Sequence, residues 1–440
     1  MKKLILLGSC LLLLFPSALP GRRVRKGDPV KVDFDPALEG GVPTISVKPI
    51  EGKGDFKGEI SIQFYVWEDR EIVLKTETIP PEREFKMELP TRGKREILGV
   101  KVEAVEKGTN EKTPLGEWRA MYFPEGRSRD YKGSNALRIP EDFEEYWNEA
   151  YEKLSLVPMD PQIEAVPERD TETGRLFKVT LNSFWNLPIV CWYYVPKEID
   201  PRNKETVRKK YPAIQIMPGW GAEEPPSDRT AEGYITLSVN PKSHGPSKDY
   251  FKTPIAHHLW NIDIPGDYYY RAAFMDCRRG IDFLFSRPEV DKGRIGVQGG
   301  SQGGTFSLAM GSLDKRVACI AANVPYLVSF PDFSALSTLG SGPIFMERTR
   351  HPGSGERVRE TLGYIDIAHH APRIGIPTLV CVGRQDPVCP PLCGVVAVNL
   401  IRDDVPKRLF IDEDAEHENS AVMMKEHEKW FEKYLNPSSD

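Results

Sequence analysis

Apolar and polar positions alternate in short runs over the first quarter of the chain, and turn-forming residues separate these runs. The clearest of them cover residues 30–34, 44–47, 60–66 and 96–102. A period of two is typical of strands that bury one face. Short strands at this spacing predict a small, immunoglobulin-like β-sandwich over residues 21–125. The segment contains no histidine and no group of side chains suited to catalysis, so we expect a packing, spacer or sugar-binding role.

The pattern changes after residues 126–137, which are polar, contain glycine and are interpreted as a linker. Pro140 and the acidic residues after it indicate the start of a helix. From there, helical spacing, as in Ala273, Cys277, Ile281 and Leu284, alternates with apolar runs typical of buried strands, at 213–217, 234–239, 294–297, 378–382 and 407–411. This alternation predicts an α/β domain over residues 138–440, with a mostly parallel sheet flanked by helices on both faces.

The first twenty residues have the pattern of an export signal. Lys2 and Lys3 precede an apolar stretch over residues 4–15, and Ser17 and Ala18 supply small residues near a cleavage point. The stretch is shorter than the ~20 residues that a membrane-spanning helix needs. The apolar run continues past Cys10, which favours a secreted or periplasmic protein over a lipid-anchored one.

Composition excludes several classes of protein. Of 440 residues, 40% are hydrophobic and 28% charged, which is typical of globular proteins, and the net charge of −5 is spread without a basic stripe. We therefore expect no nucleic-acid partner and no membrane span. Six cysteines remain after the export signal, and they favour packed thiols, although an oxidising compartment leaves a disulfide open. Cys389 and Cys393 have no partner pair at zinc spacing, so we expect no metal.

Ser301 is the predicted nucleophile. It lies in Gly299-Gly-Ser301-Gln-Gly303, after the predicted strand that ends at Val297 and before a helical segment over residues 305–313. A serine in this G-x-S-x-G context sits on a strained turn between strand and helix, with its hydroxyl exposed at the carboxyl end of the sheet. The glycines permit neighbouring backbones to approach closely.

A nucleophilic serine needs a base and an acid that orients the base, which follow it in this order in such folds. Asp386 comes after the strand that ends near residue 382, and His417 after the strand that ends near residue 411. Both would lie at the same sheet edge as Ser301. Asp412 and Asp414 are alternatives to Asp386, but they are too close to His417 in sequence to reach it from a separate strand.

Two backbone amides are candidates for stabilising an oxyanion. The amide of Gln302 would begin the helix after the nucleophile. The second donor should follow an early core strand, where Gly219-Trp220-Gly221 stands. The Trp220 amide is the candidate, with the alternative that Trp220 covers the core.

Residues 138–436 resemble carbohydrate esterase family 7, the acetyl xylan esterase and cephalosporin C deacetylase group. The resemblance rests on a series of motifs: the predicted first helix at 140–147, the segment 267–297 before the serine motif, the serine motif itself, Asp386-Pro-Val-Cys-Pro-Pro and His417-Glu418. It implies that Ser301, Asp386 and His417 form a triad and that Gln302 and Trp220 form the oxyanion hole. The implied substrates are O-acetyl groups on sugars or xylo-oligosaccharides, and homo-oligomers are common in the family.

The chain departs from the family pattern at two places. Pro218-Gly219-Trp220 replaces the usual His-Gly-Tyr, and Ser243-His244-Gly245 replaces the usual Arg-Gly-Gln. His244 is interpreted either as support for the site or as a substrate contact. These changes affect the shape and polarity of the pocket more than the chemistry, because backbone amides bind the oxyanion.

The predicted function is therefore that of a serine carboxylesterase that forms an acetyl-enzyme and needs no metal or cofactor. One alternative is a prolyl-oligopeptidase-like peptidase, although about 100 N-terminal residues are too few for its β-propeller. Another is a non-catalytic carbohydrate-binding protein.

Overall fold

The computed structural model describes residues 28–435 except 39, 51–55, 69, 126–129 and 135–136. The predicted export signal and part of the predicted linker lie outside the described residues. Within them, no helix has the length and apolarity needed to cross a lipid bilayer.

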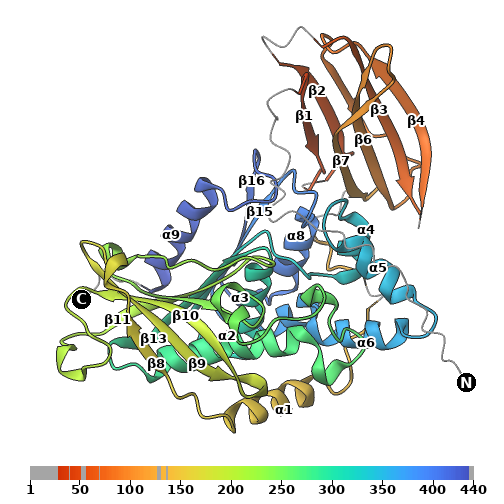
Figure 1. Ribbon diagram of the computed structural model, residues 1–440. Coiled ribbons are helices and arrows are strands. Elements are labelled where there is room, and N and C mark those ends of the chain that lie inside the picture. Colours follow the sequence, from red (N-terminus) through yellow and green to blue (C-terminus); the bar gives the residue numbers. More distant parts are fainter. Residues whose placement is uncertain are drawn as a thin grey trace, which may run out of the picture.

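Seven strands form two antiparallel sheets that share one core, as the alternating pattern predicts. The first sheet, in the order β1-β2-β5, consists of β1 (Val30–Asp35), β2 (Thr44–Pro49) and β5 (Phe85–Glu88). The second, in the order β4-β3-β6-β7, consists of β3 (Gly58–Trp67), β4 (Glu71–Ile79), β6 (Glu96–Glu106) and β7 (Lys112–Tyr122). The inward-facing residues of both sheets pack together, and Phe34 stacks on Trp118 at 6.0 Å between ring centroids. The result is a sandwich (Figure 1).

A nine-stranded sheet dominates the rest of the chain, in the order β16-β15-β14-β13-β11-β12-β10-β9-β8. Its strands are β8 (Gln162–Ala165), β9 (Gly174–Ser183), β10 (Leu187–Pro196), β11 (Tyr211–Met217), β12 (Ile235–Asn240), β13 (Val290–Gly300), β14 (Cys319–Asn323), β15 (Thr378–Gly383) and β16 (Lys407–Asp412). From β12 to β16 every neighbouring pair is parallel, whereas β8, β9 and β10 form an antiparallel end. The predicted mostly parallel sheet is confirmed.

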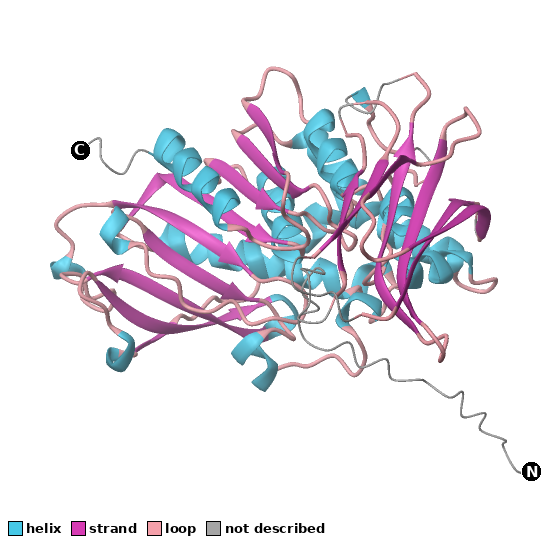
Figure 2. Ribbon diagram, turned by 90° about the horizontal axis from the view of Figure 1, so that it is seen from above, coloured by secondary structure: helices cyan, strands magenta, loops and turns pink. Residues whose placement is uncertain are grey.

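Helices cover both faces of this sheet. They are α1 (Phe143–Ser155), α2 (Tyr269–Ser286), α3 (Gln302–Leu313), α4 (Phe330–Leu336), α5 (Gly342–Arg350), α6 (Gly355–Ile365), α7 (Ile367–His370), α8 (Pro391–Leu400) and α9 (Ala421–Leu435). Helices α1, α2, α3 and α8 share a core with one face, and α9 packs on the other through Met423 and Phe431. Figure 2 shows the two groups of strands side by side, with the helices around the larger sheet. This is the predicted α/β-hydrolase fold behind a β-sandwich.

Each of the six cysteines in the described part of the chain is a buried free thiol. They are Cys191, Cys277, Cys319, Cys381, Cys389 and Cys393. The sheet and its helices are therefore held together by apolar packing without cross-links between these residues.

Helix α3 lies against β11 with no space for a side chain. A Cβ atom on Gly303 would be 2.2 Å from the Met217 carbonyl oxygen, and one on Gly299 would be 2.5 Å from the backbone of Gly303. Such contacts require movement of the backbone itself. The spacing between helix and sheet therefore depends on glycine at these two positions.

We expect Gly303→Ala to lower the free energy of unfolding by about 1–3 kcal/mol, as insertion of a methyl group into a packed interior does. Chemical denaturation measures the change. Gly375→Ala is the matched control, because a Cβ atom there meets nothing within 4 Å. Equal stability of the two variants would contradict this account of the contact.

Candidate active site

Ser301 occupies the sharp turn between β13 and α3. Its backbone has φ 57° and ψ −117°, a strained conformation for a residue with a side chain. Neighbouring strands hold the turn: the Ser301 amide donates to the Asn323 carbonyl at 3.0 Å, and the Ser301 carbonyl accepts from the Tyr326 amide at 3.2 Å. The turn therefore has a fixed shape, as the glycine motif predicts.

A hydrogen-bonded chain connects Ser301, His417 and Asp386. The Ser301 hydroxyl lies 3.0 Å from Nε2 of His417, and Nδ1 of the same ring lies 2.8 Å from Oδ2 of Asp386. The other oxygen of Asp386 accepts from the amides of Val388 and Cys389, at 2.8 Å each. Asp386 is buried, and the two backbone amides fix its carboxylate so that the other oxygen faces the imidazole.

The sequence alternatives to Asp386 point elsewhere. Asp412 accepts hydrogen bonds from the Ser420 hydroxyl and from the Asp414 amide, the latter at 3.2 Å. Of the three predicted acids, the structure brings Asp386 to His417.

Two opposing effects set the pKa of His417. Burial of the ring lowers this pKa, but the negative charge of Asp386 and its hydrogen bond raise it, so the pKa lies well above its ordinary value. The neutral form, which can accept a proton from Ser301, then forms only as the pH rises.

The two candidate oxyanion residues lie on adjoining elements. Gln302 is the first residue of α3, where backbone amides are not used by the helix. Trp220 follows β11, whose Met217 pairs with Gly299 of β13, so its loop runs beside the nucleophile turn. Both residues thus follow strands that are neighbours in the sheet.

The side chains of Trp220 and Gln302 form hydrogen bonds with two neighbouring histidines, His258 and His257. The Trp220 indole donates to Nδ1 of His258 at 3.0 Å, and the Gln302 amide group donates to Nε2 of His257 at 2.9 Å and to the Tyr270 hydroxyl at 2.7 Å. Burial lowers the pKa of His258 to about 4 and that of His257 well below its usual value. The two rings are therefore neutral acceptors at physiological pH. The sequence carries no local signal for this role, because the histidines reach Gln302 only through the tertiary fold.

His244 supports this cluster and does not line the cavity at Ser301. It is fully buried, 4.9 Å from His257 between ring centroids, and its Nδ1 lies 3.0 Å from the Tyr269 hydroxyl and 3.1 Å from the Lys242 carbonyl oxygen. Burial lowers its pKa to about 4. Of the two interpretations from the sequence, this geometry favours support of the site over contact with substrate.

A cavity of about 660 Å³ opens at Ser301 and His417. Its walls come from the ends of β11, β13 and β14, from the start of α9, and from the loop over residues 219–227. Glu224 in this loop is held through its backbone, because its amide donates to the Asn240 side chain at 2.7 Å. Burial raises the pKa of the Glu224 carboxyl group to about 8, which favours the protonated form of this cavity-lining group near neutral pH.

The described residues contain no group of three or more His, Cys, Asp or Glu side chains that could hold a metal ion. Separately, the contacts of Ser301 with His417 and of His417 with Asp386 are suited to nucleophilic attack assisted by an imidazole and a carboxylate.

The model of the acetyl xylan esterase family matches residues 123–434. The chain belongs to this family. It is a carboxylic ester hydrolase, and the resemblance found in the sequence is confirmed. The matched residues begin after β7, so the sandwich precedes the part shared with the acetyl xylan esterase family.

Individual relatives agree with this assignment. The acetyl esterase Axe7A of Xylanibacter ruminicola is 27% identical over 310 residues, which cover 67% of either protein. Acetyl xylan esterase 1 from Thermoanaerobacterium sp. JW/SL YS485 is 26% identical with a TM-score of 0.62, over 71% of this chain and 98% of that one. The acetyl xylan esterase from Paenibacillus sp. R4 is 27% identical with a TM-score of 0.63, over 70% and 98%.

The raised pKa of His417 predicts how hydrolysis depends on pH. We expect kcat/KM for p-nitrophenyl acetate to rise with pH through an apparent pKa above 6.5, because the protonated imidazole cannot accept the Ser301 proton. Asp386→Asn removes the charge that raises this pKa, so the apparent pKa should fall while kcat drops by about 10⁴-fold. A pH–rate profile measures both quantities.

Asp414→Asn is the matched control, since Asp414 lies in the same loop as His417 without reaching its ring, and its profile should equal that of the parent. An unchanged apparent pKa in Asp386→Asn would show that this carboxylate does not control His417.

Proposed function

We propose that this protein removes O-acetyl groups from sugars or short xylo-oligosaccharides, with Ser301 as nucleophile, His417 as general base and Asp386 as the orienting acid. The observation that carries the proposal is the chain of hydrogen bonds from Ser301 through His417 to Asp386, at 3.0 and 2.8 Å, beside an open cavity. Membership of the acetyl xylan esterase family supports the acetyl group as the acyl part.

In the first half of the reaction, Oγ of Ser301 attacks the acetyl carbonyl carbon while Nε2 of His417 takes the hydroxyl proton. Asp386 accepts the hydrogen bond from Nδ1, which leaves the lone pair of Nε2 facing Ser301 and stabilises the imidazolium that forms. The amides of Gln302 and Trp220 donate to the oxyanion. The carbon–oxygen bond to the sugar then breaks, and His417 returns the proton to the departing sugar oxygen.

In the second half, water replaces the sugar. His417 takes a proton from water as the water oxygen attacks the acetyl carbon. Collapse of the second tetrahedral intermediate releases acetic acid, the imidazolium returns its proton to Oγ of Ser301, and the acid ionises to acetate in solution. No redox change occurs, and in each half of the reaction the imidazole of His417 takes up one proton and then gives it back.

The cavity walls support a polar alcohol as the second half of the ester. The Glu224 carboxyl group makes no hydrogen bond or ion pair with the other described residues, and it can donate a hydrogen bond while it is protonated. Asn419 adds a side-chain amide to the same wall. Such groups suit the hydroxyls of a sugar, which both donate and accept hydrogen bonds.

We also propose that the protein is exported and acts on acetylated fragments of polysaccharides outside the cytoplasm. The proposal rests on the charged start, the apolar stretch over residues 4–15 and the small residues after it.

Ser301→Ala should abolish hydrolysis of both p-nitrophenyl acetate and acetylated xylo-oligosaccharides, because no other oxygen takes the place of Oγ. Release of p-nitrophenol and of acetate measures the two reactions. Ser155→Ala, at an exposed serine that bonds only its own helix, serves as the control and should retain full activity. Turnover of either ester by Ser301→Ala would disprove the assignment of the nucleophile.

Glu224→Leu should raise KM for an acetylated xylo-oligosaccharide by about 2- to 10-fold, the effect of losing one hydrogen bond, and leave KM for p-nitrophenyl acetate nearly unchanged. Glu224→Gln keeps a neutral donor of the same size and should resemble the parent. Glu205→Leu is the control and should resemble the parent, since Glu205 is exposed and does not line the cavity. Equal KM values for Glu224→Leu and the parent on the oligosaccharide would rule out this contact.

A further inference from the structure

The turn that carries Asp386 is connected to the loop that carries His417 by backbone contacts. The Arg384 amide donates to the Asp412 carbonyl at 2.9 Å, and the Gln385 amide donates to the Ala415 carbonyl at 3.1 Å. A Cβ atom on Gly383 would lie 2.2 Å from the Glu416 carbonyl oxygen. The two loops therefore behave as one unit, and whatever holds Arg384 and Gln385 also holds the acid and the base.

The side chains of Arg384 and Gln385 bind the first strand of the β-sandwich. The Arg384 guanidinium donates from Nη1 to the Phe34 carbonyl and from Nη2 to Oδ1 of Asp33, at 2.8 Å each. The Gln385 side-chain oxygen accepts from the Phe34 amide at 3.4 Å. Nε of Arg384 also faces the Glu413 carboxylate at 2.7 Å. The Arg384 guanidinium thus connects the sandwich with the turn that carries Asp386 and with the loop that carries His417.

The far side of Asp386 is held by another strand of the sandwich. The Pro387 carbonyl accepts from the amides of Thr338 and Leu339, at 2.9 and 3.2 Å. The Thr338 hydroxyl in turn donates to the carbonyl of Glu117 in β7 at 2.7 Å. Residues on both sides of Asp386 are therefore linked to the sandwich, through β1 before it and through β7 after it.

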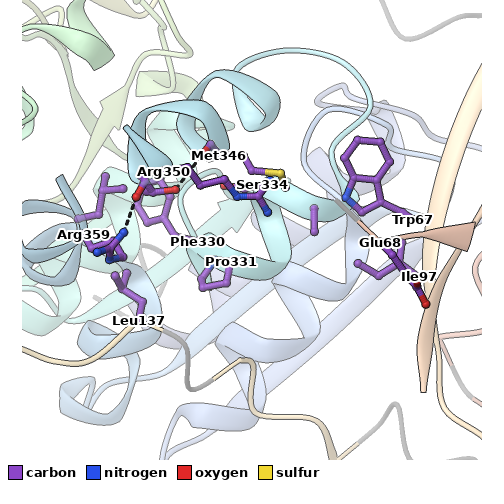
Figure 3. Close-up of a pocket in the computed structure, with 13 residues that line it drawn as sticks. Trp67, Glu68, Ile97, Leu137, Phe330, Pro331, Ser334, Met346, Arg350 and Arg359 are labelled. Atoms are coloured by element: carbon purple, nitrogen blue, oxygen red, sulfur yellow. Dashed lines mark hydrogen bonds between the residues drawn. The ribbon is translucent and has the colours of Figure 1, made fainter. Parts of the chain in front are cut away.

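Other contacts also join the two parts of the chain: the Arg119 guanidinium donates to the Ala335 carbonyl at 3.1 Å, and Leu38 shares an apolar cluster with Leu336 and Leu392. A cavity of about 390 Å³ separates Trp67 and Ile97 of the sandwich from Phe330 and Met346 on α4 and α5 (Figure 3). Figure 1 shows the sandwich standing over the ends of β15 and β16, with β1 and β7 nearest to them. The contacts of Arg384 and Gln385 with β1 are those that reach the turn next to Asp386.

We propose that the β-sandwich is a working part of the active site, in which β1 holds the Asp386 turn and the His417 loop in register through Arg384. Arg384 is a positioning residue: it touches neither the substrate nor the reacting atoms. This role of Arg384 rests on the proposed function, because a residue can position Asp386 and His417 for catalysis only if they act as the proposed triad. Displacement of a catalytic group by 1 Å can lower the reaction rate by about 100-fold. The side chain of Arg384 is only 13% exposed, so its contacts are shielded from water.

The first test compares Arg384→Ala with the parent in hydrolysis of p-nitrophenyl acetate. We expect kcat to fall by about 10- to 100-fold and KM to change less than twofold, because the cavity does not include Arg384. Arg384→Lys should recover part of the loss through one remaining hydrogen bond. Arg402→Ala is the matched control, as this exposed arginine pairs only with Asp404, and it should retain the parent kcat.

A second measurement separates positioning from loss of stability. In an Asp386→Asn background the acid is already lost, so adding Arg384→Ala should lower the residual kcat by less than twofold. A further 10-fold loss in that background would overturn the proposal, since Arg384 would then act without Asp386. An unchanged kcat in Arg384→Ala alone would overturn it as well.

A third variant tests the same contact if Arg384→Ala fails to fold. It changes a residue of the sandwich and leaves the sequence of the hydrolase part intact. Asp33 is 44% exposed in its side chain, so Asp33→Lys should fold, and its ammonium group repels Arg384. We expect a lower kcat and faster hydrogen exchange at the Val388 and Cys389 amides, which donate to Asp386. Parent-like kcat and exchange would refute the role of β1. Absence of ester hydrolysis in the parent protein would instead refute the proposed function.

Discussion

The contact between α3 and the strands beneath it leaves no room for side chains, and the position of the candidate nucleophile follows from it. Gly299 and Gly303 permit the backbones of β11, β13 and α3 to touch. The touching backbones force Ser301 into a left-handed turn and put the Gln302 amide at the free end of a helix. Since β15 and β16 are parallel neighbours in the same sheet, their carboxyl ends bring Asp386 and His417 to the same edge.

The sequence predicts β11, β12, β13, β15 and β16 because each of them is an apolar run bounded by turns, whereas the central strand β14 (Cys319–Asn323) is not among the predicted runs. It also predicts which loops carry Ser301, Asp386 and His417, since the loops after parallel strands meet at one edge. The antiparallel strands β8, β9 and β10 are not predicted. Residues 174–183 alternate like a strand of the sandwich, and only pairing with β10, which in turn pairs with β12, adds them to the larger sheet. The fold and the family are confirmed, whereas the triad stays a proposal.

Features formed by long-range contacts could not be predicted. His257 is 45 positions from Gln302, and Arg384 is 351 positions from Asp33. The local sequence pattern does not distinguish His257 or Arg384, because each residue meets its partner only after the chain has folded. The two departures from the family pattern lie close together in the structure. Trp220 contacts His258 and His244 contacts His257, and these two histidines form one buried pair.

The six buried thiols bear on how the protein can be made. Burial raises their pKa values and keeps them protonated, so they are poor nucleophiles toward one another or toward oxidants. Their side chains serve as small apolar residues of the interior. These six residues therefore need no oxidant to reach their native state, and they are compatible with a reducing environment as much as with an oxidising one.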